Sequence, residues 1–434
     1  MKKLTLPALV FLAWGLAGCD EETPTAVAQD LVPVSPRTVE VRLPWEEFAT
    51  GLEVFGGFGS PEQLGRGVLA NDFRGVLDAR TLAAWAPIGP RVSVRDTTGT
   101  TVTDSVFRFT GGRLVLRFDT LSSTNEGPVT VSAHRVLHDW HSTTVTWTAA
   151  VDTAGDRRLW PVPGGGPAEL LASGEWDPET GDSLLIELDS LAVRSWTDTA
   201  EAGRGVRLDV ETGGVRLDLN SLQLRYQGVP SVRPDTVIDF SAGTRRLTFI
   251  YTPFPEPPPQ GIRIGGAPAW RTVIRTDIPR VLTGPPELCA ALGCPFELTT
   301  QNLNHASLVL HSRTVEPAAF QPSDTVRLDV RPVLAPDRLP KSPLGPSFVA
   351  GGGRPVPPEA FGEGAPQRIA IPITTFVRSQ ISETEEGEEP PNTLALLSAF
   401  EPLSISFASF VGPGEEGEPF LRLIITRSDT VQLP

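Results

Sequence analysis

The chain has 434 residues and a formal net charge of −15, and it contains five histidines and three cysteines. An acidic chain without basic clusters is a poor partner for nucleic acid and for anionic lipid, so both are excluded as ligands. The 41 glycines and 43 prolines are spread along the sequence, and both residue types interrupt helices. The composition therefore predicts many short strands joined by turns, in a chain long enough for two or three domains.

The first residues have the order of an export signal. Two lysines follow the initial methionine, and residues 4–14 are apolar but too short to cross a bilayer as a helix. The stretch ends in Leu-Ala-Gly-Cys at 16–19, which resembles the lipobox of bacterial lipoproteins. The resemblance implies that residues 1–18 are a signal peptide and that Cys19 receives the lipid. An ordinary secretory signal, or a buried helix that ends in cysteine, is the alternative.

Residues 19–37 are polar and marked by prolines, so they are predicted to form a lipidated tether. No other segment approaches the length of a transmembrane helix, so lipid is the expected anchor. The Asp-Glu-Glu run at 20–22 directly follows the predicted lipidated cysteine, in the region that directs lipoproteins to one membrane or another. Acidic runs there resemble surface-export signals in some bacteria, whereas aspartate favours inner-membrane retention in others. We expect a cell-envelope location, at the outer membrane or cell surface rather than at the inner membrane.

Alternation of apolar and polar residues dominates the rest of the chain, and it is typical of antiparallel sheets with one buried face. Examples are residues 39–43, 113–118, 206–210 and 215–219. The Gly213-Gly214 pair predicts a β-hairpin over 206–219. The fold class is therefore predicted to be all-β, with two antiparallel jelly-roll-like β-sandwiches.

Strand signals recur in the same order in the two halves, which predicts an internal duplication. Residues 111–116, 127–136 and 184–193 correspond in character to 304–310, 325–333 and 369–377. The predicted domains are a first sandwich over 38–228, a linker or extra hairpin over 229–260, and a second, diverged sandwich over 261–434. The boundary stays open between 227 and 260, because the proline-rich segment 253–259 is also extended and stiff.

Residues 134–148 concentrate three histidines and two tryptophans. They resemble the W-x-E-x-x-V-T-W core of the DNRLRE family, although Ser and Thr stand where that family has Glu. Residues 188–196 and 419–426 look like two further strands of the family. The resemblance covers 60–226 and, more faintly, 260–427, and it implies a jelly-roll sandwich related to carbohydrate-binding modules.

Trp140, His138 and His141 are the candidate ligand-binding residues of this motif. A platform for sugar rings needs an exposed aromatic face, and the alternative is that Trp140 belongs to the core. Trp147 and Trp196 are predicted to be core residues, because both lie in segments with apolar neighbours at alternating positions.

The lipidation of Cys19 would leave Cys289 and Cys294 as a pair, and an oxidising compartment favours a disulfide between them over two free thiols. The acidic turn with Asp177, Glu179 and Asp182 is a weak calcium candidate, since its spacing departs from the EF-hand loop and an exposed polar turn is the alternative. No cofactor is expected.

The sequence contains no G-x-S-x-G motif, no metal-binding H-E-x-x-H motif, no phosphate-binding P-loop and no Cys-His nucleophile pair. The chain is therefore predicted not to be an enzyme. Two functions remain. The first is a non-catalytic binding module, held at the membrane by its lipid, with polysaccharide as a candidate ligand. The second is a structural or assembly lipoprotein that contacts other envelope proteins.

Overall fold

The computed structural model describes residues 36–427 apart from 90, 365, 383–389 and 403. The predicted signal peptide, Cys19 and the tether as far as residue 35 lie outside the described residues. The strand pairs within the described residues are all antiparallel, so the predicted all-β fold class is confirmed. None of the helices in this part of the chain has the length and apolar character needed to cross a membrane.

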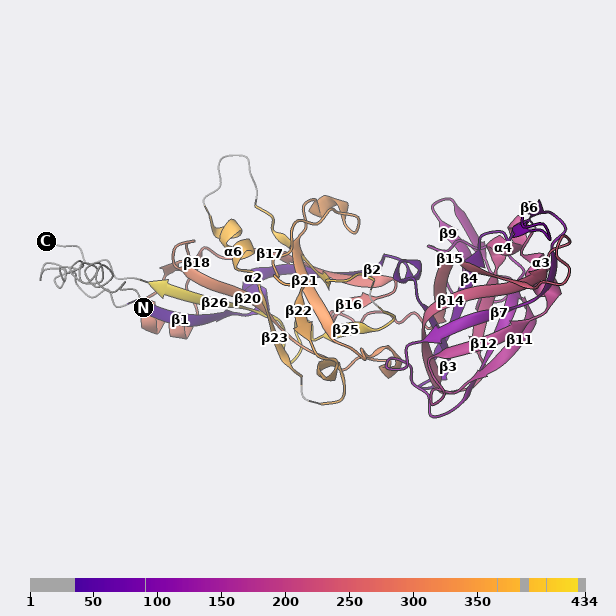
Figure 1. The fold of residues 1–434 in the computed structure, drawn as a ribbon. Coiled ribbons are helices and arrows are strands. Elements are labelled where there is room, and N and C mark those ends of the chain that lie inside the picture. The colour runs from indigo at the N-terminus through magenta and orange to yellow at the C-terminus, as the bar shows by residue number, and fades with distance from the viewer. Residues whose placement is uncertain (1–35, 90, 365, 383–389, 403, 428–434) are drawn as a thin grey trace, which may run out of the picture.

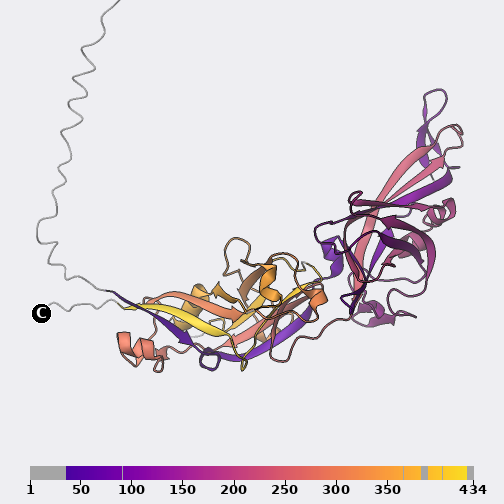
Figure 2. The same ribbon diagram turned by 90° about the horizontal axis from the view of Figure 1, so that it is seen from below.

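The described residues form two lobes that lie end to end (Figure 1). We call residues 59–254 the insert lobe, and residues 36–58 together with 255–427 the base lobe. The chain leaves the base lobe after its first two strands, which lie in different sheets, and returns to it near residue 255, as the view from below also shows (Figure 2).

The insert lobe is one nine-stranded antiparallel sheet that curls back on itself, with two small hairpins and two short helices attached. Its sheet strands are β3 (Gly67–Phe73), β4 (Leu77–Trp85), β7 (Arg108–Phe118), β8 (Val129–Val136), β11 (Ala168–Trp176), β12 (Ser183–Leu188), β13 (Val206–Val210), β14 (Val215–Val229) and β15 (Ile238–Thr252). They lie in the order β11-β8-β13-β4-β15-β14-β7-β12, and β3 pairs with β14 and β4. Leucines and valines at alternating positions, such as Leu116, Val131 and Leu208, fill the interior.

The small elements of the insert lobe connect these strands. They are the hairpins β5 (Val92–Arg95) with β6 (Thr101–Asp104) and β9 (Ala149–Thr153) with β10 (Asp156–Leu159), the 3-10 turn η2 (Pro61–Leu64), and the helices α3 (Ser190–Ser195) and α4 (Thr199–Arg204). Each helix begins at an aspartate whose side chain accepts backbone hydrogen bonds of the first turn, Asp189 for α3 and Asp198 for α4.

The base lobe is a sandwich of a four-stranded and a seven-stranded sheet. The first has the order β1 (Arg37–Leu43), β26 (Phe420–Arg427), β20 (Leu303–His311), β23 (Arg368–Pro372). The second has the order β22 (Arg354–Val356), β21 (Val326–Pro332), β24 (Thr393–Ser398), β17 (Ala269–Thr276), β16 (Ile262–Gly266), β25 (Phe407–Phe410), with β2 (Ala49–Phe58) on β17. Buried residues of both sheets, such as Leu423 and Ile274, share one core.

Short elements complete the base lobe. They are the helices α2 (Trp45–Phe48), α5 (Pro286–Leu292) and α6 (Thr374–Ile381), the strand pair β18 (Val281–Leu282) with β19 (Phe296–Glu297), and the 3-10 turns η3 (Ala318–Phe320), η4 (Pro336–Arg338) and η5 (Pro358–Phe361). The two lobes touch through aromatic packing: the Tyr251 and Phe320 rings lie 5.9 Å apart, and Arg74 donates to the Ala318 carbonyl at 2.6 Å.

The domain boundaries predicted from the sequence differ from the observed pairing at both ends of the first sandwich. Strand β1 pairs with β26, and β2 pairs with β17, so residues 38–58 belong to the base lobe. Strand β15 falls in the segment 229–260, which the sequence predicts to be a linker or an extra hairpin; it pairs with both β4 and β14 and is an inner strand of the insert lobe. One lobe is thus inserted into the other, and Phe58 and Gly266, on either side of the insertion, both face Ala269.

The repeated strand signals are matched by repeated strand pairings. In the insert lobe β7 pairs with β12 and β14, and in the base lobe β20 pairs with β23 and β26. Likewise β8 pairs with β11 and β13, and β21 pairs with β22 and β24. A helix follows in corresponding positions, α3 after β12 and α6 after β23. These pairings are alike in the two lobes, although the insert lobe has one curled sheet and the base lobe has two separate sheets. The internal duplication stays a prediction.

Three local predictions were wrong. Strands β13 and β14 do not pair with each other, so 206–219 is not a hairpin; β13 lies between β8 and β4, and β14 lies between β15 and β7. Residues 190–195 form helix α3 rather than a strand. Residues 137–148 form a loop that packs on the outside of the sheet, where Trp140 and Val145 cover Val136 and Leu82.

Candidate functional site

The candidate ligand residues of the histidine-rich motif do not form a common site. Trp140 is only 5% exposed, and its indole Nε1 donates to the Arg204 carbonyl at 2.9 Å, so it is a core residue and not a sugar platform. His138 is half-buried, and its Nδ1 has no hydrogen-bond partner among the described residues. His141 is exposed and lies 3.1 Å from the Thr143 hydroxyl.

The two tryptophans that were predicted to be buried have different environments. Trp196 is fully buried at the end of α3, with its ring 5.7 Å from that of Trp85. Trp147 is only partly buried, because it lies in the outer loop and not in a strand. Among the described tryptophans, Trp147 and Trp45 are the two that are not buried.

The acidic turn does not assemble a cation site. The Asp177 carboxylate accepts from the Glu179 backbone at 2.9 Å, and Asp182 faces Arg117 at 3.6 Å. Across the part of the chain that the structure describes, no three His, Cys, Asp or Glu side chains are grouped so that they could hold a metal ion. The turn is an exposed connection between β11 and β12.

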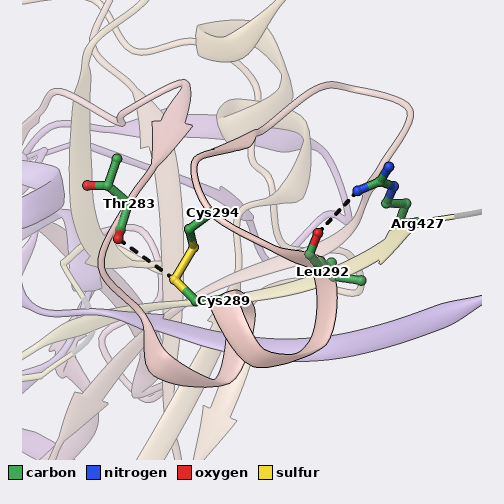
Figure 3. Close-up of a disulfide and its surroundings, with 5 residues drawn as sticks. All are labelled: Thr283, Cys289, Leu292, Cys294 and Arg427. Atoms are coloured by element: carbon green, nitrogen blue, oxygen red, sulfur yellow. Dashed lines mark hydrogen bonds between the residues drawn. A yellow bond between two sulfur atoms is a disulfide. The ribbon is translucent and has the colours of Figure 1, made fainter.

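Cys289 and Cys294 form a disulfide at helix α5, as Figure 3 shows. The helix lies against the two strands at which the described chain begins and ends: Arg427 donates to the Leu292 carbonyl at 3.1 Å, and Arg37 donates to the Ala291 carbonyl at 3.4 Å. The disulfide thus closes the segment that covers the end of the base lobe remote from the insert lobe (Figure 1).

A surface with mixed aromatic and charged character surrounds Trp147. The Arg80 guanidinium lies over the Trp147 ring, 5.0 Å from its centroid, and its Nη1 donates to the Gly164 carbonyl. Both arginine and tryptophan are held in place by this stacking, which is favourable because the cation meets the negative face of the ring. We call Arg80, His134, Trp147 and Asp209 the Trp147 surface.

Asp209 is the centre of the charge network on this surface. Arg207 binds it through two hydrogen bonds, from Nε at 2.9 Å and from Nη2 at 2.7 Å. Arg80 and His134 each approach it to 3.7 Å. A bidentate arginine holds a carboxylate in one orientation, so the polar groups of the Trp147 surface are pre-positioned.

Burial sets the ionisation of the His134 ring. It lowers the pKa of His134 below its ordinary value, the nearby Arg207 and Arg80 act in the same direction, and Asp209 opposes them. His134 is therefore neutral at neutral pH and offers one donor and one acceptor nitrogen. Burial also lowers the pKa of Arg80, although that guanidinium stays charged at neutral pH.

A three-glycine turn forms one side of this surface. Gly164 has a φ of +86°, and a Cβ at this position would lie 2.6 Å from Arg80 Nη1. The backbone conformation favours glycine here, and a Cβ would in addition displace the Arg80 guanidinium from its place beside the turn. The carbonyl of Gly166 accepts from Arg207 Nη1 at 2.8 Å.

Arg80, Arg207 and Asp209 were not predicted from the sequence as site residues. A signal was available, because Val-Arg-Leu-Asp occurs at 206–209 and again at 215–218, and residues two apart on a strand share a face. Both copies form an ion pair, Arg207 with Asp209 and Arg216 with Asp218 at 3.1 Å. Apolar alternation predicts which face of a strand is buried, whereas the ion pairs depend on the polar residues of the opposite face.

No family model and no curated protein matches the sequence. Two solved structures show a distant likeness at 9% identity and a TM-score of 0.10. One is described as "BspA_C_WT" and covers 77% of this chain and 90% of its own. The other is the "Structure of the Macrobrachium rosenbergii Nodavirus", with 87% of this chain and 90% of its own. Neither likeness shows a family for this chain.

Proposed function

We propose that the chain is an exported, lipid-anchored lipoprotein of the cell envelope, at the outer membrane or cell surface, and that it acts as a non-catalytic binding protein for polysaccharide. The Trp147 surface is the proposed contact site. It combines a partly exposed indole with a fixed carboxylate and a neutral imidazole, and such a mixture suits the apolar faces and hydroxyl groups of a sugar ring.

The position of the chain ends supports the anchoring part of the proposal. Arg37, near the start of the described chain, is opposite Arg427 at the end of β26, so both lie at the end of the base lobe remote from the insert lobe (Figure 1). A tether over 19–37 would hold the base lobe towards the membrane. The insert lobe and its Trp147 surface would then point outward, where an extracellular ligand can reach them.

The anchor is tested by Cys19→Ala in the full-length chain. We expect the variant to leave the membrane fraction, because lipid is the proposed attachment and no described helix could replace it. Detergent-free fractionation followed by immunoblotting measures this, with Cys289→Ala as a control that removes a cysteine from the disulfide and should stay membrane-bound. Membrane retention of Cys19→Ala would refute the lipid anchor.

The ligand is tested by Trp147→Ala on a glycan array. Loss of aromatic stacking should weaken binding about tenfold, equivalent to roughly 1.4 kcal/mol. Trp45→Ala is the matched control, because Trp45 is the other partly exposed tryptophan of the described chain but lies in the base lobe. Equal binding by both variants would remove the Trp147 surface from the proposal, and no binding by the unaltered protein would favour the structural or assembly role.

A further inference from the structure

The outer face of the insert-lobe sheet carries arginines on three neighbouring strands, β15, β14 and β7. Buried leucines such as Leu224 point inward from β7 and β14, so alternation along the strands places Arg113, Arg117 and Arg225 on the outer face. Arg245 is exposed at an outward position of β15. Strands β14 and β7 lie side by side in Figure 1. We call these four arginines the arginine face.

Two arginines of this face are placed where their charges repel. Arg113 and Arg225 stand directly opposite each other in the pairing of β7 with β14, and like charges in opposite positions destabilise a sheet. Neither guanidinium forms an ion pair with a carboxylate among the described residues, and Arg225 Nε donates instead to Gln223 Oε1 at 3.2 Å. Folding therefore does not require this pair, whereas a bound anion would neutralise it.

A hollow of about 360 Å³ lies on the same face. Arg225 and Arg117 line it together with Ser221 and Gln223, and Gly243 lines it from β15. Nothing lies within 4 Å of the position that a Cβ at Gly243 would take, so the absence of a side chain leaves this part of the surface free. No carboxylate of the described residues lines the hollow. Its charged groups are therefore all positive.

The acidic residues of the outer face stand at its margins. Asp182 lies just before β12, 3.6 Å from Arg117. Glu187 lies on β12, opposite Arg113 in register. Asp239 accepts a hydrogen bond from an amide near the start of β15. An anion over β7 and β14 thus reaches the arginines without displacing a carboxylate from the hollow.

The spacing of the arginines favours an extended ligand with several negative groups. Arg113 and Arg117 are four positions apart on one strand, which is roughly 13 Å, so a single small anion does not serve both. Guanidinium groups bind oxyanions through paired N–H donors. The hydroxyl of Ser221 and the amide of Gln223 can pair with hydroxyl groups of the same ligand.

The charge of the rest of the chain selects among extended anions. Duplex nucleic acid carries one charge per about 1.7 Å of its axis, and an anionic bilayer is a broad negative surface. Both would meet the acidic remainder of a chain whose net charge is −15. We propose that the arginine face binds an acidic polysaccharide, whose carboxylate or sulfate groups are spaced along a hydroxyl-rich chain. The inference rests on the proposed polysaccharide function for the class of ligand, and it adds a second contact and the ligand's charge.

The test uses isothermal titration of the full-length protein with an oligogalacturonate, with the same oligomer fully methyl-esterified, and with sulfated dextran. The ester keeps the sugar backbone but has no charge, so it is the matched ligand. Arg113→Gln and Arg225→Gln should each weaken binding of the charged glycan about fivefold, the effect of one exposed ion pair. Arg354→Gln is the matched control, because it removes the same charge from an exposed arginine of β22 in the base lobe.

The expected result is that the oligogalacturonate binds more tightly than its ester, that added salt weakens its binding, and that the control variant does not. Binding of sulfated dextran alone, with the same variant pattern, supports sulfate as the negative group. Trp147→Ala should leave this binding unchanged. If neutral glycans bind through the Trp147 surface and neither charged glycan binds, the inference is wrong while the proposed function stands.

Three further outcomes would overturn the inference. The first is equal binding of the oligogalacturonate and its ester, because the arginines then do not select charge. The second is a loss of binding in Arg354→Gln as large as in Arg113→Gln and Arg225→Gln. The third is tighter binding of a DNA oligonucleotide or of phosphatidylglycerol vesicles with the same variant pattern, which would assign the arginine face to another class of anion.

Discussion

Replacing Trp196 by alanine is expected to destabilise the insert lobe by about 3–5 kcal/mol, the usual cost of deleting a large buried aromatic side chain. The side chain is fully buried, and its ring lies edge-on to Trp85 at an interplanar angle of 61°. The backbone carbonyl of Trp196 also accepts from Ile88 at 2.9 Å, which ties the end of α3 to the loop after β4. Since ordinary domains are stable by about 5–15 kcal/mol, most of the insert lobe's margin would be lost.

Denaturant unfolding of the full-length protein, followed by tryptophan fluorescence, measures this effect. Leu191→Ala is the matched control, because it lies in the same helix but is 69% exposed, so its unfolding free energy should change by less than about 0.5 kcal/mol. Trp196→Phe should fall between the two, since it retains part of the packing. Equal stability of Trp196→Ala and Leu191→Ala would contradict the core assignment.

The isolated fragment 59–254 is expected to fold cooperatively, whereas 38–228 is not. The first fragment contains the complete nine-stranded sheet. The second lacks β15, which pairs along β4 and β14, and carries β1 and β2 without their partners β26 and β17. Without β15 the sheet opens at its middle, and buried residues such as Leu247 and Ile250 are absent from the core.

Circular dichroism melting of the two purified fragments checks this prediction. Fragment 59–254 should give one cooperative transition, at a lower temperature than in the intact protein because Phe73 and Phe249 lose their packing against the base lobe. Fragment 38–228 should aggregate or melt without cooperativity. Cooperative melting of both fragments would show that β15 is dispensable and that the lobe boundary is misplaced.

The strand predictions were wrong where a loop or a helix carries apolar residues at spacings that also occur in strands. The loop 137–148 contains apolar residues because Trp140 and Val145 pack on Leu82 and Val136 on the outside of the sheet. In α3 the buried residues Ala192, Val193 and Trp196 have helical spacing. The cap at Asp189 was the sequence signal that distinguishes this helix from a strand.

The sequence by itself determined the features that depend on residue order over short distances. Apolar alternation predicted the antiparallel all-β class, which the strand pairings confirm. The disulfide between Cys289 and Cys294 was expected because an oxidising compartment favours a bond between the two cysteines that are left when Cys19 carries lipid.

Only the tertiary structure decided which strands complete each lobe. The pairing of Arg37 with Arg427 joins the two ends of the described chain, and no local pattern specifies such a partner, because alternating strands of similar length are interchangeable until their apolar faces pack together. The same packing brought Arg80, Trp147 and Asp209 onto one surface. These groups are far apart in sequence, and their proximity follows from sheet register, which arises only when the whole chain folds.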